Sequence, residues 1–104
     1  MTGEGTKTGG MVREKPKAET ERPRQYKVVL HNDDYTTMQF VVEVLESIFQ
    51  MSPAEAHRVM MHVHQRGHGI AGVYPHEIAE TKVDQVHDRA REEGFPLRAS
   101  MDEA

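Results

Sequence analysis

The stretch YKVVLHNDDYTT, residues 26–37, determines how the rest of the chain is interpreted. Its first half, residues 26–31, is apolar and rich in β-branched side chains, which predicts a strand. The polar cluster Asn-Asp-Asp at residues 32–34 is typical of a turn. Thr36, with Gln39 three residues later, has the pattern of a capping box and predicts the start of a helix. A strand, a turn and a helix start are therefore expected within this one stretch.

Two helices are expected to follow the turn. The apolar residues within 38–49 recur at the spacing of one buried helical face. Ser52 and Pro53, with Glu55 three residues after the serine, predict the start of a second helix because serine caps well and proline fits the first turn. Gly67 is expected to end that helix.

The last part of the chain predicts two further strands and a long helix. Residues 68–74 are short and apolar, and Gly69 and Gly72 within them indicate a strand with a bulge or a close backbone approach. A long helix follows and is expected to end at Gly94, before a final strand at residues 97–101. The order is strand, helix, helix, strand, helix, strand. We therefore expect an α+β fold with three short antiparallel strands and three helices on one face.

Composition divides the chain into two unequal parts. Its 104 residues are enough for one small domain. Residues 1–24 contain no aromatic side chain and carry a net charge of +2, whereas residues 25–104 contain every aromatic residue and carry a net charge of −6. The first segment cannot bury enough apolar surface to offset the entropy lost on ordering it. We expect a disordered N-terminal extension at 1–24 and one folded domain at 25–104.

Composition and net charge also argue against several classes of protein. The absence of cysteine excludes a disulfide scaffold and a thiol nucleophile. A net charge of −4 argues against nucleic acid as the main partner, because phosphate binding needs clustered Lys and Arg. No apolar run approaches the ~20 residues of a membrane span, and the N-terminus lacks the apolar region of a secretory signal. A cytoplasmic protein that contacts neither membrane nor nucleic acid is expected.

The seven histidines of the chain raise the question of a metal site. On a helix, His62 and His64 are two positions apart and point about 200° from one another, so they cannot hold one ion together. The chain also lacks a helical histidine pair four residues apart, a glycine-rich phosphate loop and a nucleophile elbow. We expect neither a metal nor another cofactor.

Residues from three parts of the sequence suggest a binding site. The polar cluster at 32–34 precedes a helix start that carries Met38 and Val41, while Met60 and His64 lie one turn apart on the next helix. Amide and carboxylate oxygens beside a hollow lined by methionine and valine suit a cation attached to an apolar group. Methionine also suits a pocket that accepts several apolar shapes, because its side chain repacks easily.

Three other interpretations stay open at this point. The polar cluster could serve only the backbone of its own turn. The methionines and valines could be ordinary core. Asp33 or Asp34 could act with His64 as the acid–base pair of a small enzyme, since adjacent carboxylates raise one another's pKa.

Several motifs also occur in the order and at the spacing of a known family. Residues 26–36 resemble the signature of ClpS, the adaptor of the bacterial Clp protease. The likeness covers roughly residues 24–103, and Thr37 stands where some members have proline. The further matching motifs are Met38-x-Phe40-Val41, Val63-His64-x-x-Gly67, Gly72-Val73-Tyr74, Ala79-Glu80-Thr81-Lys82-Val83 and Pro96-Leu97.

The resemblance implies a function and a set of residues that perform it. It implies an adaptor, not an enzyme, which binds N-degron proteins whose first residue is Leu, Phe, Tyr or Trp and delivers them to the ClpA unfoldase of the ClpAP protease. The residues implied to bind the substrate's α-amine are Asn32, Asp33, Asp34 and His64. Those implied to line the hydrophobic pocket for the first side chain are Thr36, Met38, Val41, Met60, Val63 and Leu97.

Two further features of the family concern its partner. Docking on the N-terminal domain of ClpA is implied for Glu77 and Lys82, and the N-terminal segment is implied to engage the unfoldase during delivery. The main alternative is a small protein-docking module that modulates a protease or another partner without reading N-terminal residues.

Overall fold

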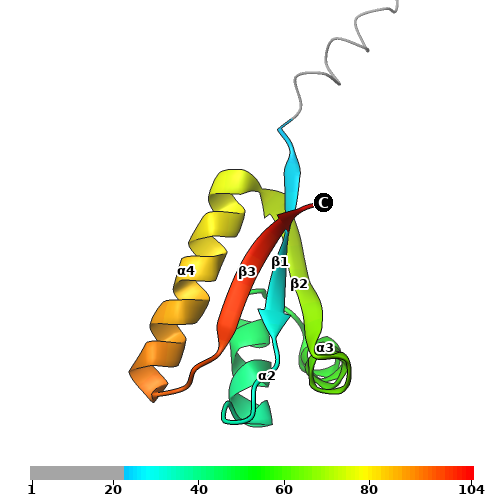
Figure 1. Cartoon of the computed structure of the whole chain (residues 1–104). Helices are drawn as coiled ribbons and strands as arrows, with labels where there is room; N and C mark the ends of the chain where they lie inside the picture. Colours follow the sequence, from blue (N-terminus) through cyan, green and yellow to red (C-terminus); the bar gives the residue numbers. More distant parts are fainter. Residues whose placement is uncertain (1–22) are drawn as a thin grey trace, which may run out of the picture.

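The computed structural model describes residues 23–104, and six elements follow one another along them in the predicted order. The expected extension at 1–24 falls outside the described residues except for its last two, and stays a prediction. Figure 1 shows the arrangement of the elements. Their bounds are β1 Gln25–His31, α2 Met38–Ser47, α3 Pro53–Arg66, β2 His68–Pro75, α4 His76–Glu93 and β3 Arg98–Glu103.

The three strands form one antiparallel sheet in the order β2-β1-β3, so the expected α+β class is confirmed. The register between β1 and β2 shifts between Val28 and Val29, which is the bulge that the glycines predict. Gly69 provides the close approach, because a Cβ atom there would lie only 2.8 Å from Cγ2 of Val63. A glycine at this position therefore allows β2 to lie against α3.

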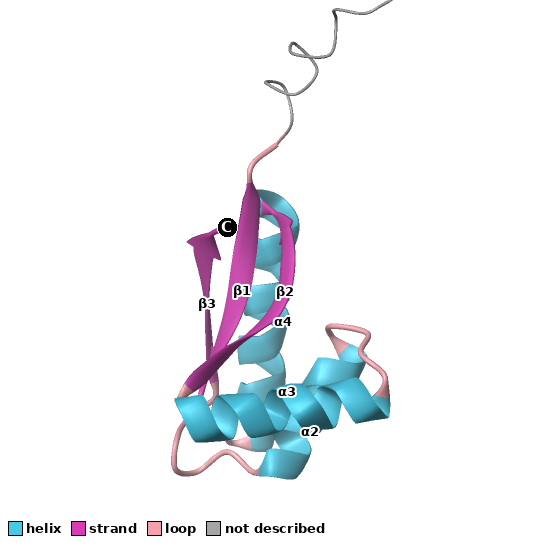
Figure 2. Ribbon diagram, turned by 90° about the vertical axis from the view of Figure 1, so that its right-hand side faces the viewer, coloured by secondary structure: helices cyan, strands magenta, loops and turns pink. Residues whose placement is uncertain are grey.

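The helices occupy two places around the sheet. Figure 2 shows α4 running along the sheet, whereas α2 and α3 lie together near the end at which β1 finishes. The core between them is wholly apolar and includes the fully buried Val28 and Leu30 of β1, Leu45 of α2, and Val86 of α4. No helix of the described part of the chain is long and apolar enough to cross a membrane.

The start of α2 differs from the prediction by one residue. Thr37, not Thr36, is the N-cap, and its Oγ1 accepts a hydrogen bond of 3.1 Å from the N–H of Phe40. The predicted capping box of Thr36 and Gln39 is wrong because the hydroxyl of Thr36 donates to Asp33 instead. The carboxylate of Asp33 thus keeps Thr36 in the preceding loop.

The boundaries of α3 agree with the prediction. The Oγ atom of Ser52 accepts a hydrogen bond of 3.2 Å from the N–H of Glu55, and Pro53 is the first helical residue. Gly67 ends the helix with φ 93°, a left-handed conformation that glycine adopts without steric cost. These local signals set the first and last residues of α3, and the helical repeat then determines which of its side chains share a face.

Candidate functional site

The loop between β1 and α2 is tied to the end of α3. The N–H of Asn32 donates a hydrogen bond of 2.8 Å to the carbonyl oxygen of Gly67. This bond joins the first residue of the loop to the C-cap of α3. The polar cluster of residues 32–34 therefore lies beside the last turn of α3, on which His64 is found.

Asp33 organises this loop through three hydrogen bonds. Its Oδ1 atom accepts from the N–H groups of Tyr35 and Thr36, at 2.8 and 2.7 Å. Its Oδ2 atom accepts from the hydroxyl of Thr36 at 2.7 Å. The turn chemistry considered for this cluster is therefore present. A carboxylate offers about four acceptor positions, so one position on Oδ2 is left for another donor.

These hydrogen bonds also set the charge of the carboxyl group. Burial acts to raise the pKa of Asp33, but the hydrogen bonds from Thr36 and Tyr35 outweigh it and hold the pKa below its ordinary value. The group is consequently ionised at neutral pH. Because the pKa is lowered on folding, its contribution to stability is present above the ordinary carboxyl pKa and is lost as the pH falls through the lowered one.

A cavity of about 230 Å³ opens beside the loop and is lined by nine residues. The loop, α2 and α3 each supply part of its wall, so the structure brings together residues that are far apart in the sequence. Nine of the ten residues that the family resemblance implies for amine binding and the pocket line this one cavity. They are Asn32, Asp33, Asp34, Thr36, Met38, Val41, Met60, Val63 and His64.

The cavity has an apolar wall and a polar rim. Val41, Met60 and Val63 are buried, with 7%, 4% and 2% of their surface exposed, and they also belong to the hydrophobic core. Met38 is 44% exposed. The alternative of ordinary core packing therefore holds in part, because the same side chains serve the core on one side and the cavity on the other.

Leu97 is the predicted pocket residue that does not line the cavity. It is 4% exposed and belongs to the hydrophobic core, between the end of α4 and the start of β3. The chain turns after α4, and Leu97 is buried where it enters β3. A part for Leu97 in the pocket stays a prediction.

Lys82 of α4 makes contacts that the sequence does not suggest. Its ammonium group donates a hydrogen bond of 2.6 Å to the carbonyl oxygen of Ile48, the C-cap of α2. It also lies over the rings of Phe49 and Tyr74, 6.0 and 5.6 Å from their centroids. Lys82 therefore supports the end of α2, whereas Glu77 is exposed in the first turn of α4.

Two larger hollows exist elsewhere on the described surface. One of about 420 Å³ lies between α3 and β2, and one of about 440 Å³ lies beside Lys82 and Arg89. Residues 23–104 contain no group of three or more His, Cys, Asp or Glu side chains that could hold a metal ion. Among these hollows, the cavity at the loop is the one that joins carboxylate and amide oxygens to a methionine and valine wall.

Comparison with known proteins gives consistent matches over most of the chain. The family model "ATP-dependent Clp protease adaptor protein ClpS" matches residues 21–100. The chain is 57% identical over 93 residues to the ATP-dependent Clp protease adapter protein ClpS of Desulfatibacillum aliphaticivorans, covering 89% of each chain. It is 52% identical over 99 residues to the protein of the same name from Rhodospirillum centenum, covering 95% of this chain and 90% of that one.

A solved structure is similar in fold and in sequence. It is the structure of Agrobacterium tumefaciens ClpS2 bound to L-phenylalaninamide, with a TM-score of 0.77 and 43% identity. The similarity covers 80% of this chain and 100% of that one.

Proposed function

Since the chain belongs to the ClpS family of ATP-dependent Clp protease adaptor proteins, we propose that it binds N-degron substrates and delivers them to the ClpA unfoldase of the ClpAP protease. It would recognise a free N-terminal α-amine together with a bulky hydrophobic first residue, Leu, Phe, Tyr or Trp. No bond is made or broken in this process. The protein acts as an adaptor and not as an enzyme, and it works in the cytoplasm.

The observation that carries the proposal is the cavity with ionised Asp33 at its rim. An α-amino group has a pKa of about 7.7–8.0 and is mostly cationic at neutral pH. The free acceptor position on Oδ2 of Asp33, with the side-chain oxygens of Asn32 and Asp34 nearby, suits such a cation. Charge-assisted hydrogen bonds of this kind are roughly twice as strong as neutral ones. An internal residue has no such amine, so the site would recognise chain ends only.

The apolar wall of the cavity accounts for the second half of the recognition. Burying a Leu or Phe side chain there would contribute about 1.5–3 kcal/mol. Met38 and Met60 can adjust their shape to different side chains at low cost. The ligand of the similar ClpS2 structure, L-phenylalaninamide, also combines an α-amine with a bulky apolar side chain, which supports the proposal.

Delivery would involve other parts of the chain. Docking on the N-terminal domain of ClpA is proposed for Glu77 and Lys82 of α4, and engagement of the unfoldase for residues 1–24. The ammonium group of Lys82 donates a hydrogen bond to the carbonyl oxygen of Ile48, so Lys82 would also hold the end of α2 in place for docking.

Binding to a series of peptides that differ only in the first residue tests the proposal. Peptides beginning with Leu, Phe, Tyr or Trp should bind about tenfold or more tightly than those beginning with Ile or Val, because we expect the cavity to exclude side chains branched at Cβ on steric grounds. Fluorescence titration gives the affinities. Equal affinities for all first residues would instead favour a protein-docking module that does not read the chain end.

Deletion of residues 1–20 should separate binding from delivery. The cavity lies within residues 32–64, so peptide affinity should not change, whereas degradation of an N-degron substrate by ClpAP should slow. A version with residues 1–20 replaced by a Gly/Ser segment of equal length distinguishes the length of the segment from its sequence. Normal degradation with the truncated chain would show that the segment has no part in delivery.

A further inference from the structure

Helix α2 forms one wall of the cavity. Met38 and Val41 of α2 form this wall, and Met60 and Val63 of α3 form the wall on the other side of the cavity. The two helices pack against each other near the end of the sheet. The separation of α2 and α3 therefore sets the width of the space between these side chains.

The opposite face of α2 is held by α4. At 100° per residue, the mean direction of Phe40 and Glu43 lies roughly 160° around the helix from the mean direction of Met38 and Val41. Phe40 is 4% exposed and packs against the ring of Phe95, with 4.9 Å between the ring centroids. Helix α2 thus lies between α3 on its cavity side and the end of α4 on its other side.

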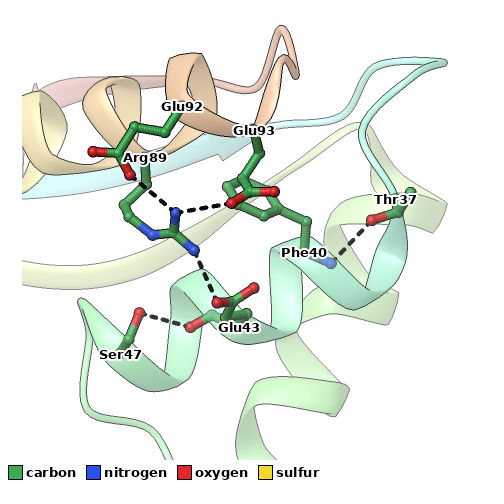
Figure 3. Close-up of polar contacts among 7 residues, drawn as sticks. All are labelled: Thr37, Phe40, Glu43, Ser47, Arg89, Glu92 and Glu93. Carbon is green, nitrogen blue, oxygen red and sulfur yellow. Dashed lines mark hydrogen bonds and ion pairs between the residues drawn. The ribbon is translucent and has the colours of Figure 1, made fainter.

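Arg89 of α4 is at the centre of the polar contacts between α4 and this face of α2, as Figure 3 shows. Its Nη2 atom lies 2.8 Å from a carboxylate oxygen of Glu43 on α2. Its Nη1 atom lies 3.2 and 3.4 Å from Glu92 and Glu93 on its own helix. Its guanidinium carbon lies 5.5 Å from the centroid of the Phe40 ring.

We infer that Arg89 is a positioning residue, which draws α2 toward α4 and thereby keeps the cavity wide enough for a large first residue. The inference rests on the proposed function, because it assigns a role in that same site. Arg89 does not line the cavity and acts only through α2.

Two effects point in the same direction when the guanidinium group is removed. The attraction between Glu43 and α4 is lost, and Glu43 is left facing the like charges of Glu92 and Glu93. Both effects move α2 away from α4 and toward α3. The side chain of Arg89 is only 30% exposed and serves three carboxylates and a ring, so it differs from a single exposed ion pair, which contributes little.

The test is the ratio of affinities for Trp- and Leu-initiated peptides in Arg89→Met and in the unaltered chain. Methionine keeps an apolar stem over Phe40 and removes the charge. A narrower cavity should lower the affinity for Trp more than that for Leu, and change the ratio by about three- to tenfold. Arg89→Lys keeps the charge and should restore most of the ratio.

Two more variants make the comparison decisive. Glu43→Gln keeps the size of the side chain and should shift the ratio in the same direction by a smaller factor, even if Arg89→Met fails to fold. Arg91→Met is the matched control, since Arg91 is exposed on the same helix and pairs with Asp88 one turn away. Its ratio should equal that of the unaltered chain.

An unchanged Trp-to-Leu ratio in both Arg89→Met and Glu43→Gln would overturn the inference, even if both variants lose stability or bind all peptides more weakly. That result would leave the proposed function intact. If the unaltered chain shows no preference for hydrophobic first residues, the proposed function fails and the inference fails with it.

Discussion

Replacing Asp33 with alanine is expected to weaken the binding of a Leu- or Phe-initiated peptide by about 2–5 kcal/mol, the usual cost of removing one partner of a hydrogen-bonded charge pair that binding shields from water. The carboxylate is ionised and has one acceptor position free at the rim of the cavity. Without it, the α-ammonium group would lose its counter-charge. Fluorescence titration of a labelled peptide measures the loss.

Alanine at position 33 also removes the three hydrogen bonds that hold the loop, so a second variant is needed. Asp33→Asn keeps an oxygen that can accept from the N–H groups of Tyr35 and Thr36, but it removes the charge. Most of the loss should therefore remain in Asp33→Asn. Asp84→Ala, which removes the same charge from an exposed position on α4, should bind normally. Full affinity in Asp33→Asn would show that Asp33 serves the loop and not the amine.

Local signals in the sequence were sufficient to predict most of the fold. The β-branched run of β1, the Ser52 cap and Pro53 of α3, and the left-handed Gly67 each act over a few neighbouring residues. The start of α2 could not be predicted as well, since two threonines compete for the cap. The choice between Thr36 and Thr37 depends on the hydrogen bond from Thr36 to the side chain of Asp33, a residue that is not part of the capping pattern.

The candidate site shows the same division between local and distant information. Patterns of residue type at the end of β1 and on two helices were enough to suggest a polar rim beside a methionine and valine wall. The burial of Leu97 depends on how the chain turns from α4 into β3, so local patterns of residue type could not predict its surroundings.

The supporting contacts of α2 depend on distant parts of the chain. Lys82 is 34 residues from Ile48, and Arg89 is 46 residues from Glu43. In the sequence, both are ordinary cations on an amphipathic helix. Packing of α4 near α2 is what gives them a role.

The most direct measurement compares one Leu-initiated peptide with a free N-terminus and with an acetylated N-terminus. Acetylation removes the positive charge and leaves only one N–H of the ammonium group's three as a donor to Asp33, while the first side chain stays in place. We expect a loss of about 2–5 kcal/mol, and little further loss when the acetylated peptide is tested on Asp33→Asn, which keeps an acceptor for the loop, because the charge interaction is already absent. Equal affinity for the two peptides would contradict the recognition of a free chain end.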